Sequence, residues 1–482
     1  MNRSDILIEG RPRVLAARAA SLRALILITA DVSAFVLATC TAFVMHMAVR
    51  LSPLERAYQQ IVSTGVNWPG WATLLVLTVL LTHFGSRGHY TNRIPFWTEL
   101  HGVVTGVFIA FLCDCFIRVA VYGLTFVFEG VARWLVFAPC ILLTRQTARC
   151  ALRACGLWTL RTLMVGERSA ISSARAALLS EPGLGYDLAG IIPLEAISVK
   201  QFADPWPGIL SEYGAEFVVV GVGAGYPETE RAVVLSLARN QVPFALVPAL
   251  DGLPVTGFRN QYFFSHDVVL LVCRNNLARP LSRFIKSVFD QILAAAALVL
   301  LAPLFLVLAW MIRSDGGPAL FGHTRIGANG QKFRCLKFRT MVPDADAALQ
   351  RILSTDPRAR AEWHSAHKLR DDPRITRIGM FLRQTSLDEL PQLLNVLRGE
   401  MSLVGPRPIV DAEIPRYGDN IAYYYEAKPG ITGLWQVSGR SNTSYEDRVK
   451  LDVWYVRNWT LWHDIAILLK TIPAVLLKKG AV

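Results

Sequence analysis

Four apolar stretches fill most of the first 150 residues, and they constrain the possible folds more than any other feature of this chain. They cover about 22–46, 71–86, 100–123 and 124–145, each near the length that spans a bilayer, with the second the shortest. The 482 residues are 52% hydrophobic, more than a soluble protein of this size carries. We therefore predict a membrane protein whose residues 1–150 form an N-terminal four-helix transmembrane bundle.

Arginines flank these stretches on both sides and indicate the orientation of the bundle. An even number of spans agrees with placing both flanks in the cytoplasm, where cationic loops concentrate. No small-residue cleavage site follows a short apolar core, so we expect no removable signal peptide. The flanking arginines are Arg3, Arg11, Arg13, Arg18 and Arg23 before the first stretch, and Arg145, Arg149, Arg153 and Arg161 at and after the end of the fourth.

Three charged residues fall inside the predicted spans, namely Asp31, Asp114 and Arg118. A charge at that depth is costly enough to need a partner. Asp114 and Arg118 are four residues apart and can pair on one helix face, which favours a structural pair over the alternative, a transport path.

The net charge of +13 fits an anionic lipid surface or an anionic substrate better than nucleic acid, because the chain has no zinc-finger or RNA-binding signature. Its eight cysteines show no CxxC spacing, so we expect neither disulfides nor a zinc site.

Residues 151–275 change to short β-branched runs, such as 162–166 and 217–221, that alternate with helical segments. This alternation predicts a Rossmann-like α/β domain with a parallel sheet. The turn after Gly166 lacks the second and third glycines of a dinucleotide fingerprint, and the glycine-rich turn at 221–225 comes later than the first strand. A structural or regulatory module is favoured over a nucleotide site.

A further apolar run, about 292–312, has cations on both sides, so the charge rule gives it no crossing direction. Pro303 lies within the run and can bend a helix. We therefore predict a re-entrant helix over about 284–312, which keeps the following residues on the same face as the α/β domain. A kinked span is the alternative. The flanking cations are Arg274, Arg279, Arg283 and Lys286 before the run, and Arg313, Arg325, Lys332 and Arg334 after it.

Adjacent carboxylates, Asp388 and Glu389, stand at a predicted helix start that Pro391 follows, within a basic region. Helix N-termini favour anions, so this is a place to handle phosphate. Ser386 and Glu389 also match a capping box, which is the alternative interpretation. Cationic and Gly/Pro-rich segments surround the dyad in the sequence, and together they supply the guanidinium forks and backbone N–H groups that a diphosphate needs.

Several motifs, in order, resemble those of the bacterial sugar transferase family, the monotopic polyprenyl-phosphate hexose-1-phosphate transferases. The motifs are KFRTM, DPRITRIG, LRQTSLDELPQLLNVLRGEMSLVGPRP, KPGITGLWQVSGR and LDVWYVRNWTLW. The resemblance implies a mainly α catalytic domain over 276–482 with a membrane-re-entrant helix. Together with residues 93–100, the preceding domains resemble the long members, the undecaprenyl-phosphate galactose-1-phosphate transferases that begin O-antigen, capsule or exopolysaccharide synthesis.

The resemblance also implies a chemistry. Asp388 would be the nucleophile that takes a sugar phosphate from a UDP-sugar and releases UMP, Glu389 would bind Mg²⁺, and undecaprenyl phosphate would be the acceptor. Galactose is the expected sugar and glucose the alternative; a nucleotide-sugar hydrolase is the alternative activity. The expected location is the bacterial inner membrane, with the catalytic domain on its cytoplasmic face, and a homodimer is one option for its assembly. The implied substrate-binding positions are Lys337, Arg339, Asp372, Arg374, Arg383, Arg407, Gln436 and Arg440, and the re-entrant helix carries Lys286 and Pro303.

Overall fold

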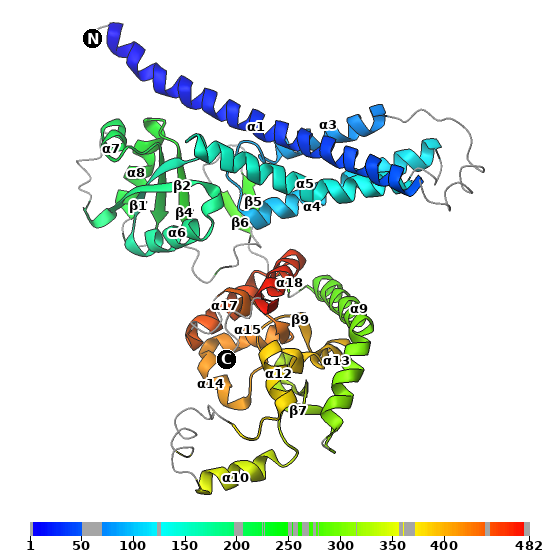
Figure 1. The fold of residues 1–482 in the computed structure, drawn as a ribbon. Helices are drawn as coiled ribbons and strands as arrows, with labels where there is room; N and C mark the ends of the chain where they lie inside the picture. The colour runs from blue at the N-terminus through cyan, green and yellow to red at the C-terminus, as the bar shows by residue number, and fades with distance from the viewer. Residues whose placement is uncertain are drawn as a thin grey trace. The chain divides into compact units, whose positions relative to one another are not determined.

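The protein divides into two compact units, Met1–Ala249 and Leu250–Val482 (Figure 1). The structure is a computed structural model. It describes residues 3–50, 70–122, 127–196, 206–223, 225, 227–248, 253, 259–262, 269–272, 276–277, 279–314, 316–355, 360, 372–438 and 444–476.

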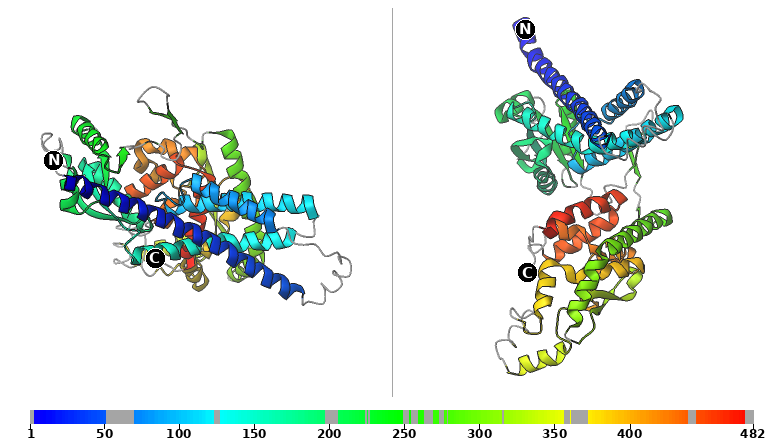
Figure 2. Two further views of the ribbon diagram at one scale, coloured as in Figure 1. Left: turned by 90° about the horizontal axis from the view of Figure 1, so that it is seen from above. Right: turned by 45° about the vertical axis from the view of Figure 1, so that its right-hand side comes forward.

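Four apolar helices begin the first unit, as the sequence predicts: α1 (Arg3–Arg50), α3 (Gly70–Ser86), α4 (Phe96–Tyr122) and α5 (Val127–Ala154). Three of them contain segments long and apolar enough to cross a membrane, whereas the apolar part of α3 is shorter. Helix α1 packs along α5, and α4 packs against both α5 and α3 (Figure 2). Among the described residues, a fourth helix of sufficient length and apolarity, Pro280–Arg313, belongs to the second unit.

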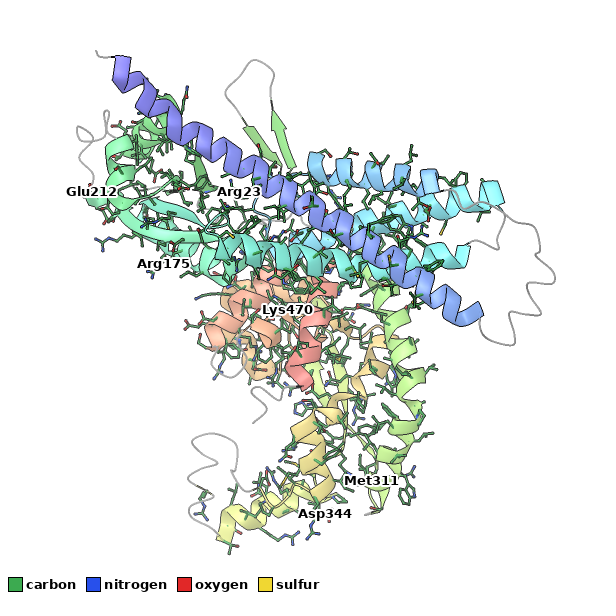
Figure 3. All side chains as sticks on the ribbon, turned by 45° about the horizontal axis from the view of Figure 1, so that its top comes forward. Arg23, Arg175, Glu212, Met311, Asp344 and Lys470 are labelled. Carbon is green, nitrogen blue, oxygen red and sulfur yellow. The ribbon has the colours of Figure 1, made fainter. Side chains whose placement is uncertain are left out.

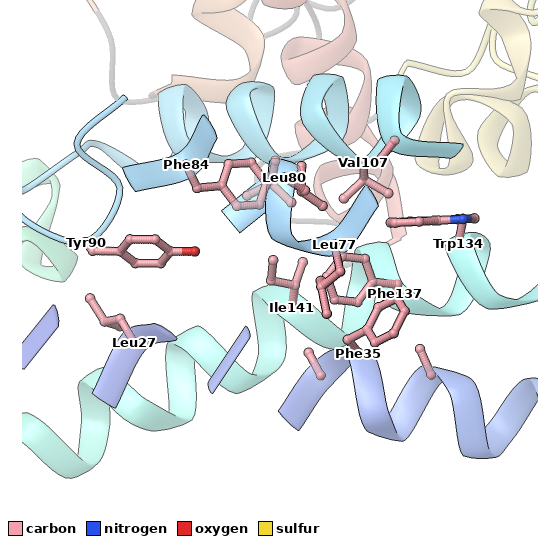
Figure 4. Packing of buried hydrophobic residues seen from close by; sticks show 14 of the residues in the cluster. Leu27, Phe35, Leu77, Leu80, Phe84, Tyr90, Val107, Trp134, Phe137 and Ile141 are labelled. Carbon is pink, nitrogen blue, oxygen red and sulfur yellow. The ribbon is translucent and has the colours of Figure 1, made fainter. Parts of the chain in front are cut away.

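The interior of this bundle is built from large side chains that interlock. Phe35, Trp134 and Phe137 meet with ring centroids 5.5–5.9 Å apart, and Leu80 and Phe84 of α3 belong to the same buried cluster (Figure 4). The opposite faces carry exposed apolar residues, which suit a lipid environment.

A buried ion-pair cluster joins three of the helices at one level. Arg145 of α5 donates to both carboxylate oxygens of Asp31 in α1, at 2.7 and 2.6 Å, and to Glu99 of α4 at 2.9 Å. Arg149 donates to Glu99 at 2.7 Å, and Tyr90 donates to Asp31 at 2.8 Å. The partner expected for Asp31 is therefore present, and the two carboxylates balance the two guanidinium groups.

The predicted pair of Asp114 with Arg118 stays a prediction, because the side chain of Arg118 lies outside the described part of the chain. Asp114 accepts hydrogen bonds from Trp134 at 3.0 Å and from Thr73 at 3.3 Å.

An α/β region completes the first unit and confirms the predicted parallel sheet. Its four strands pair in the order β2-β1-β3-β4, and all pairs are parallel. Helix α6 follows β1, and α8 joins β3 to β4. The elements are β1 (Leu160–Gly166), α6 (Arg168–Ser180), η2 (Pro182–Leu184), β2 (Tyr186–Pro193), η3 (Leu194–Ala196), α7 (Trp206–Tyr213), β3 (Phe217–Val222), α8 (Pro227–Arg239) and β4 (Phe244–Pro248).

Internal carboxylates occupy the glycine-rich turn after β3. Gly223 N–H donates to Glu230 at 2.8 Å, and Gly225 N–H donates to Glu167 at 3.2 Å. Glu167 stands between β1 and α6, so both carboxylates lie at the strand ends where the strand order reverses. Nucleotide phosphates bind at this place in related folds. Here the chain fills it with its own acidic groups.

The second unit is mainly helical, as predicted for the catalytic domain. It contains the antiparallel pairs β5–β6 and β7–β8 and the parallel pair β9–β10. Its elements are β5 (Arg259–Tyr262), β6 (Val269–Val272), α9 (Pro280–Arg313), β7 (Leu320–Ile326), η5 (Ala328–Gly330), β8 (Lys332–Phe338), α10 (Ala345–Thr355), α12 (Arg377–Thr385), η6 (Leu387–Glu389), α13 (Gln392–Leu397), β9 (Ser402–Val404), η7 (Asp411–Glu413), α14 (Ile414–Tyr417), η8 (Gly418–Asn420), α15 (Ile421–Glu426), β10 (Gly430–Thr432), α16 (Leu434–Ser438), α17 (Tyr445–Arg457) and α18 (Leu461–Leu476).

Helix α9 is one continuous helix that contains Pro303, and both of its ends are attached to this same unit. Near its start, Lys286 donates to Asp464 of α18 at 2.7 Å. Near its end, Leu308 and Ile312 are buried in a cluster with residues of β8 and α12. The stretch between is largely exposed and apolar. Figure 3 shows the side chains of α9, with Met311 labelled in its last turn.

Candidate active site

The dyad lies in a tight turn between two helices. Ser386, which ends α12, has a left-handed backbone (φ 56°), and the 3₁₀ turn η6 then carries Asp388 and Glu389. The Ser386 side chain makes no capping hydrogen bond there, so the capping-box interpretation is not realised. Asp388 is only 9% exposed, and Pro391 leads into α13. The turn thus presents two neighbouring carboxylates without placing them on a regular helix.

Lys337, from β8, bridges the two carboxylates. Its Nζ lies 2.6 Å from Glu389 Oε1 and 3.4 Å from Asp388 Oδ2. Burial raises the pKa of Asp388, and the Glu389 charge adds to this, while the Lys337 ammonium group opposes it. Burial alone would lower the pKa of Lys337, but the two carboxylates outweigh burial and leave it raised. Lys337 therefore stays cationic beside a carboxyl group that is costly to ionise.

Asn395 of α13 fixes the strand that carries Lys337. Its side chain is fully buried, donates to the carbonyl of Arg334 at 2.8 Å and accepts from the N–H of Leu336 at 2.9 Å. These bonds hold β8 against α13, immediately before Lys337. Sequence reasoning did not single out Asn395, because its partners are about 60 residues away.

A cavity of about 1670 Å³ opens beside the dyad and gathers most of the positions that the sequence implicates. Arg374 lines it and is held in a fork by Asp372, at 2.8 and 2.7 Å, although Asp372 itself is not part of the lining. Arg440 lies outside the described residues, and Lys286 and Pro303 lie away from the cavity. The implicated residues in the lining are Lys337, Arg339, Arg374, Arg383, Asp388, Glu389, Arg407 and Gln436.

The arginines of the lining differ in what they already bind. Arg339 donates to the carbonyls of Pro318, Met341 and Ile312 at 2.8–3.0 Å, so much of its guanidinium group holds the backbone. Arg383 donates to the hydroxyl of Thr340 at 2.9 Å. This assigns Arg339 a supporting task in addition to any contact with substrate.

Two residues beside Arg407, the aromatic Trp435 and the acidic Asp452, were not predicted from the sequence as parts of the site. The guanidinium groups of Arg407 and Arg448 lie 5.7 and 5.4 Å from the ring centre of Trp435, which lines the cavity. Asp452 of α17 is buried and accepts from Tyr417 at 2.8 Å. Burial raises the pKa of Asp452 to about 7. Trp435 and Asp452 both stand inside motifs quoted above, but nothing in their spacing indicated that both would lie beside Arg407.

The carboxylates are suited to a divalent cation that arrives with a phosphate. Within the described part of the chain, no three His, Cys, Asp or Glu side chains converge as a metal site. Mg²⁺ is commonly held by one or two carboxylates together with substrate phosphates, so the dyad fits such an ion without further ligands.

A buried carboxylate beside a lysine, in a cation-lined cavity that also touches the apolar helices α9 and α18, defines a membrane-associated enzyme for phosphorylated substrates. Comparison with known proteins makes this specific: residues 281–478 match the bacterial sugar transferase family. Over 403 residues the chain is 41% identical to the UDP-galactose-lipid carrier transferase of Erwinia amylovora, covering 82% of this chain and 84% of that protein. The chain belongs to the bacterial sugar transferase family, and the resemblance seen in its motifs is confirmed.

Two other relatives show over how much of its length this chain resembles known proteins. The undecaprenyl-phosphate galactose phosphotransferase of Salmonella typhimurium is 40% identical over 402 residues, covering 82% of this chain and 84% of that protein. The exopolysaccharide production protein ExoY of Sinorhizobium fredii is 51% identical over 204 residues, which are 42% of this chain and 90% of that protein. The shorter relative therefore matches less than half of this chain over nearly all of its own length.

Proposed function

We propose that this protein transfers galactose 1-phosphate from UDP-galactose to undecaprenyl phosphate, giving undecaprenyl-diphosphate-galactose and UMP. The observation that carries the proposal is the buried Asp388 carboxylate, paired with Lys337 and facing a cavity lined with arginine. Two relatives that each match 82% of the chain support galactose, because both are named for galactose transfer.

In the first step, a carboxylate oxygen of Asp388 attacks the β-phosphorus of the UDP-sugar. The bond from that phosphorus to the oxygen bridging the two phosphates breaks, and UMP leaves with the bridging oxygen and the electron pair. An acyl phosphate then joins the sugar phosphate to Asp388. A carboxylate needs no separate base, so the protein's main task is to offset the negative charge that meets at this phosphorus.

Cationic side chains that can offset this negative charge lie in and around the cavity. Lys337 is within reach of Asp388, and Arg383 and Arg407 line the same cavity and can bind phosphate oxygens as forks. Glu389, with Asp388 beside it, would hold Mg²⁺. When bound, that ion neutralises the diphosphate and stabilises the leaving UMP.

In the second step, a phosphate oxygen of undecaprenyl phosphate attacks the phosphorus of the acyl phosphate. The bond to Asp388 breaks, the carboxylate is regenerated, and the lipid diphosphate sugar is formed. The burial of Asp388 limits the access of water, which favours transfer over hydrolysis.

The attachment of α9 supports a re-entrant helix. A spanning helix carries its two ends to opposite sides of the bilayer, whereas Lys286 and Ile312, near the two ends of α9, both contact the folded unit that holds Asp388. The exposed apolar middle, including Val299 and Leu300, would then enter the membrane and return. Together with the flanking arginines, this favours a cytoplasmic face for the catalytic unit.

The test is UMP release by the detergent-extracted protein with Mg²⁺, undecaprenyl phosphate and, separately, UDP-galactose, UDP-glucose or UDP-N-acetylglucosamine. Turnover with UDP-galactose that stops without the lipid is expected. Asp388→Asn should abolish both steps, because an amide forms no acyl phosphate, whereas Glu389→Gln should chiefly raise the Mg²⁺ concentration needed. Multiple turnovers without lipid would identify a hydrolase instead, and a fully active Asp388→Asn protein would refute the nucleophile.

A further inference from the structure

The cavity beside the dyad has a second, apolar wall that phosphate chemistry does not explain. Ala297 and Leu301 of α9 and Leu468 and Ile472 of α18 line it together with the dyad and the arginines. One continuous space therefore connects Asp388 with side chains from two strongly apolar helices.

The spacing of these residues makes two facing stripes. Ala297 and Leu301 are four residues apart on α9, as are Leu468 and Ile472 on α18, so each pair lies on one face of its helix. The two helices are tied together at the Lys286–Asp464 ion pair, where the distance is 2.7 Å. Each stripe begins beyond this tie, further along its helix.

The polar groups along this wall are satisfied by one another. The hydroxyl groups of Thr432 and Thr471 lie 2.9 Å apart, and the Thr471 hydroxyl donates to the carbonyl of Ile467 at 2.8 Å. The charged members of the lining come from β8, the 339–345 segment, Arg374, α12 with the dyad turn, and Arg407, and none comes from α9 or α18. The α9–α18 side thus offers contact to hydrocarbon rather than to phosphate.

The apolar wall also reaches the lipid-facing surface. Ile472 is 56% exposed although it lines the cavity, and Leu300, next to Leu301 on α9, is 80% exposed. Apolar residues so exposed are stable where the surface meets hydrocarbon. A lipid could therefore pass from the bilayer into the cavity without its chain crossing water.

We propose that the facing stripes Ala297/Leu301 and Leu468/Ile472 form the seat for the isoprenoid chain of the acceptor, and that they guide its phosphate to Asp388. This rests on the proposed function, because it assigns a place to the acceptor of that reaction. Small or aliphatic side chains on both walls suit a branched, unsaturated hydrocarbon, which gains by burial and needs no hydrogen bonds.

The experiment fills the seat and measures the two steps separately. Leu301→Trp places a large ring in the space between the helices, and Leu300→Trp, one residue earlier on the exposed face, is the matched control. In single-turnover assays without lipid, UDP-[¹⁴C]galactose should label both variants and release one equivalent of UMP, as in the parent protein. Steady-state assays should then show the KM for undecaprenyl phosphate raised about tenfold or more in Leu301→Trp only.

A second variant tests the proposal independently, in case Leu301→Trp fails to fold. Ile472→Trp obstructs the opposite wall at a half-exposed position, and it should raise the same KM. A water-soluble C10 isoprenyl phosphate, whose shorter chain buries less apolar surface, should discriminate less between parent and variants. Equal KM values for the lipid in all variants would overturn the seat, and so would an equal loss of labelling and transfer, because the wall would then serve the donor or the fold. Absence of labelling in the parent protein would refute the proposed function instead.

Discussion

Asp388 and Lys337 shift each other's pKa, and in the proposed reaction this pair would set the dependence of the rate on pH. Burial raises the pKa of the Asp388 carboxyl, while Lys337 opposes that rise. Only the ionised carboxylate attacks phosphorus. The rate of the first step should therefore increase as pH rises through the raised pKa of Asp388.

Replacing Lys337 by Met should shift the acid limb of the pH profile, the range in which the rate rises with pH, to higher pH. Without the ammonium group, Arg383 is left as the weaker opposition to burial and the Glu389 charge, so the pKa of Asp388 rises and a higher pH is needed to ionise it. The measurement is kcat/KM for UMP release against pH. Lys332→Met, at an exposed position of the same strand, should leave the limb in place. A limb that shifts downward in Lys337→Met would contradict this account.

Arg339 shows where sequence reasoning about single residues reaches its limit. Its motif identifies it as a site residue, but three backbone carbonyls, including that of Ile312 in the last turn of α9, accept from it. Lysine cannot reproduce a planar fork. Arg339→Lys should therefore destabilise the catalytic unit by about 2 kcal/mol, because carbonyls are left unpaired in a buried place.

Thermal unfolding in detergent measures this, with Arg334→Lys at an exposed position of β8 as the control. If Arg339→Lys unfolds at the parent temperature but loses activity, the arginine serves substrate rather than backbone.

At the scale of elements, the sequence predicted the character of helix α9 better than the conformation of the turn that carries Asp388 and Glu389. Ser386, Pro391 and the two carboxylates indicated a helix start, and the structure has a 3₁₀ turn between α12 and α13 instead. A left-handed residue at 386 cannot be deduced from a serine, since that conformation is imposed by the packing of the two helices. The flanking charges and Pro303 did indicate an unusual helix at α9. They could not indicate its anchor, because Lys286 meets Asp464 across 178 residues of sequence.

The anchor gives a prediction about this element. Lys286→Met leaves Asp464 and the nearby Asp290 buried without their cation, which should cost about 3–5 kcal/mol of unfolding free energy. The double variant Lys286→Met/Asp464→Asn removes one of the stranded charges and should regain part of the loss. Denaturant unfolding followed by tryptophan fluorescence measures both. Equal stabilities of parent and Lys286→Met would show that the pair contributes nothing to anchoring.

At the scale of the whole molecule, the membrane bundle and the α/β domain followed from apolar length and periodicity, whereas the mainly helical unit was implied by the resemblance of its motifs. The interactions that hold the first unit together did not follow from either. Arg145 and Arg149 were counted only as flanking charges, yet both are paired inside the bundle with acidic residues from α1 and α4. Sequence spacing gives the helices, but it does not give which faces meet.

The filled glycine turn predicts that the α/β domain does not take up dinucleotides. Glu167 and Glu230 accept the backbone N–H groups that a pyrophosphate would use, and their charge repels it. NAD⁺ at millimolar concentration should therefore leave the unfolding temperature of the full-length protein unchanged. UDP-galactose with Asp388→Asn serves as the positive control, because under the proposed function it binds the second unit and this variant does not consume it. A rise in unfolding temperature with NAD⁺ that persists in that variant would contradict the assignment.

The way α9 is tethered at both ends also bears on the path of the product. If α9 enters the bilayer and returns, as proposed above, the catalytic unit exchanges lipids with one leaflet only, so the acceptor would arrive and the loaded carrier would leave by lateral diffusion in the same leaflet. Its diphosphate and sugar then stay on the side where the nucleotide was spent. Displaying that sugar on the far side of the membrane therefore requires a separate protein that turns lipid-linked saccharides over.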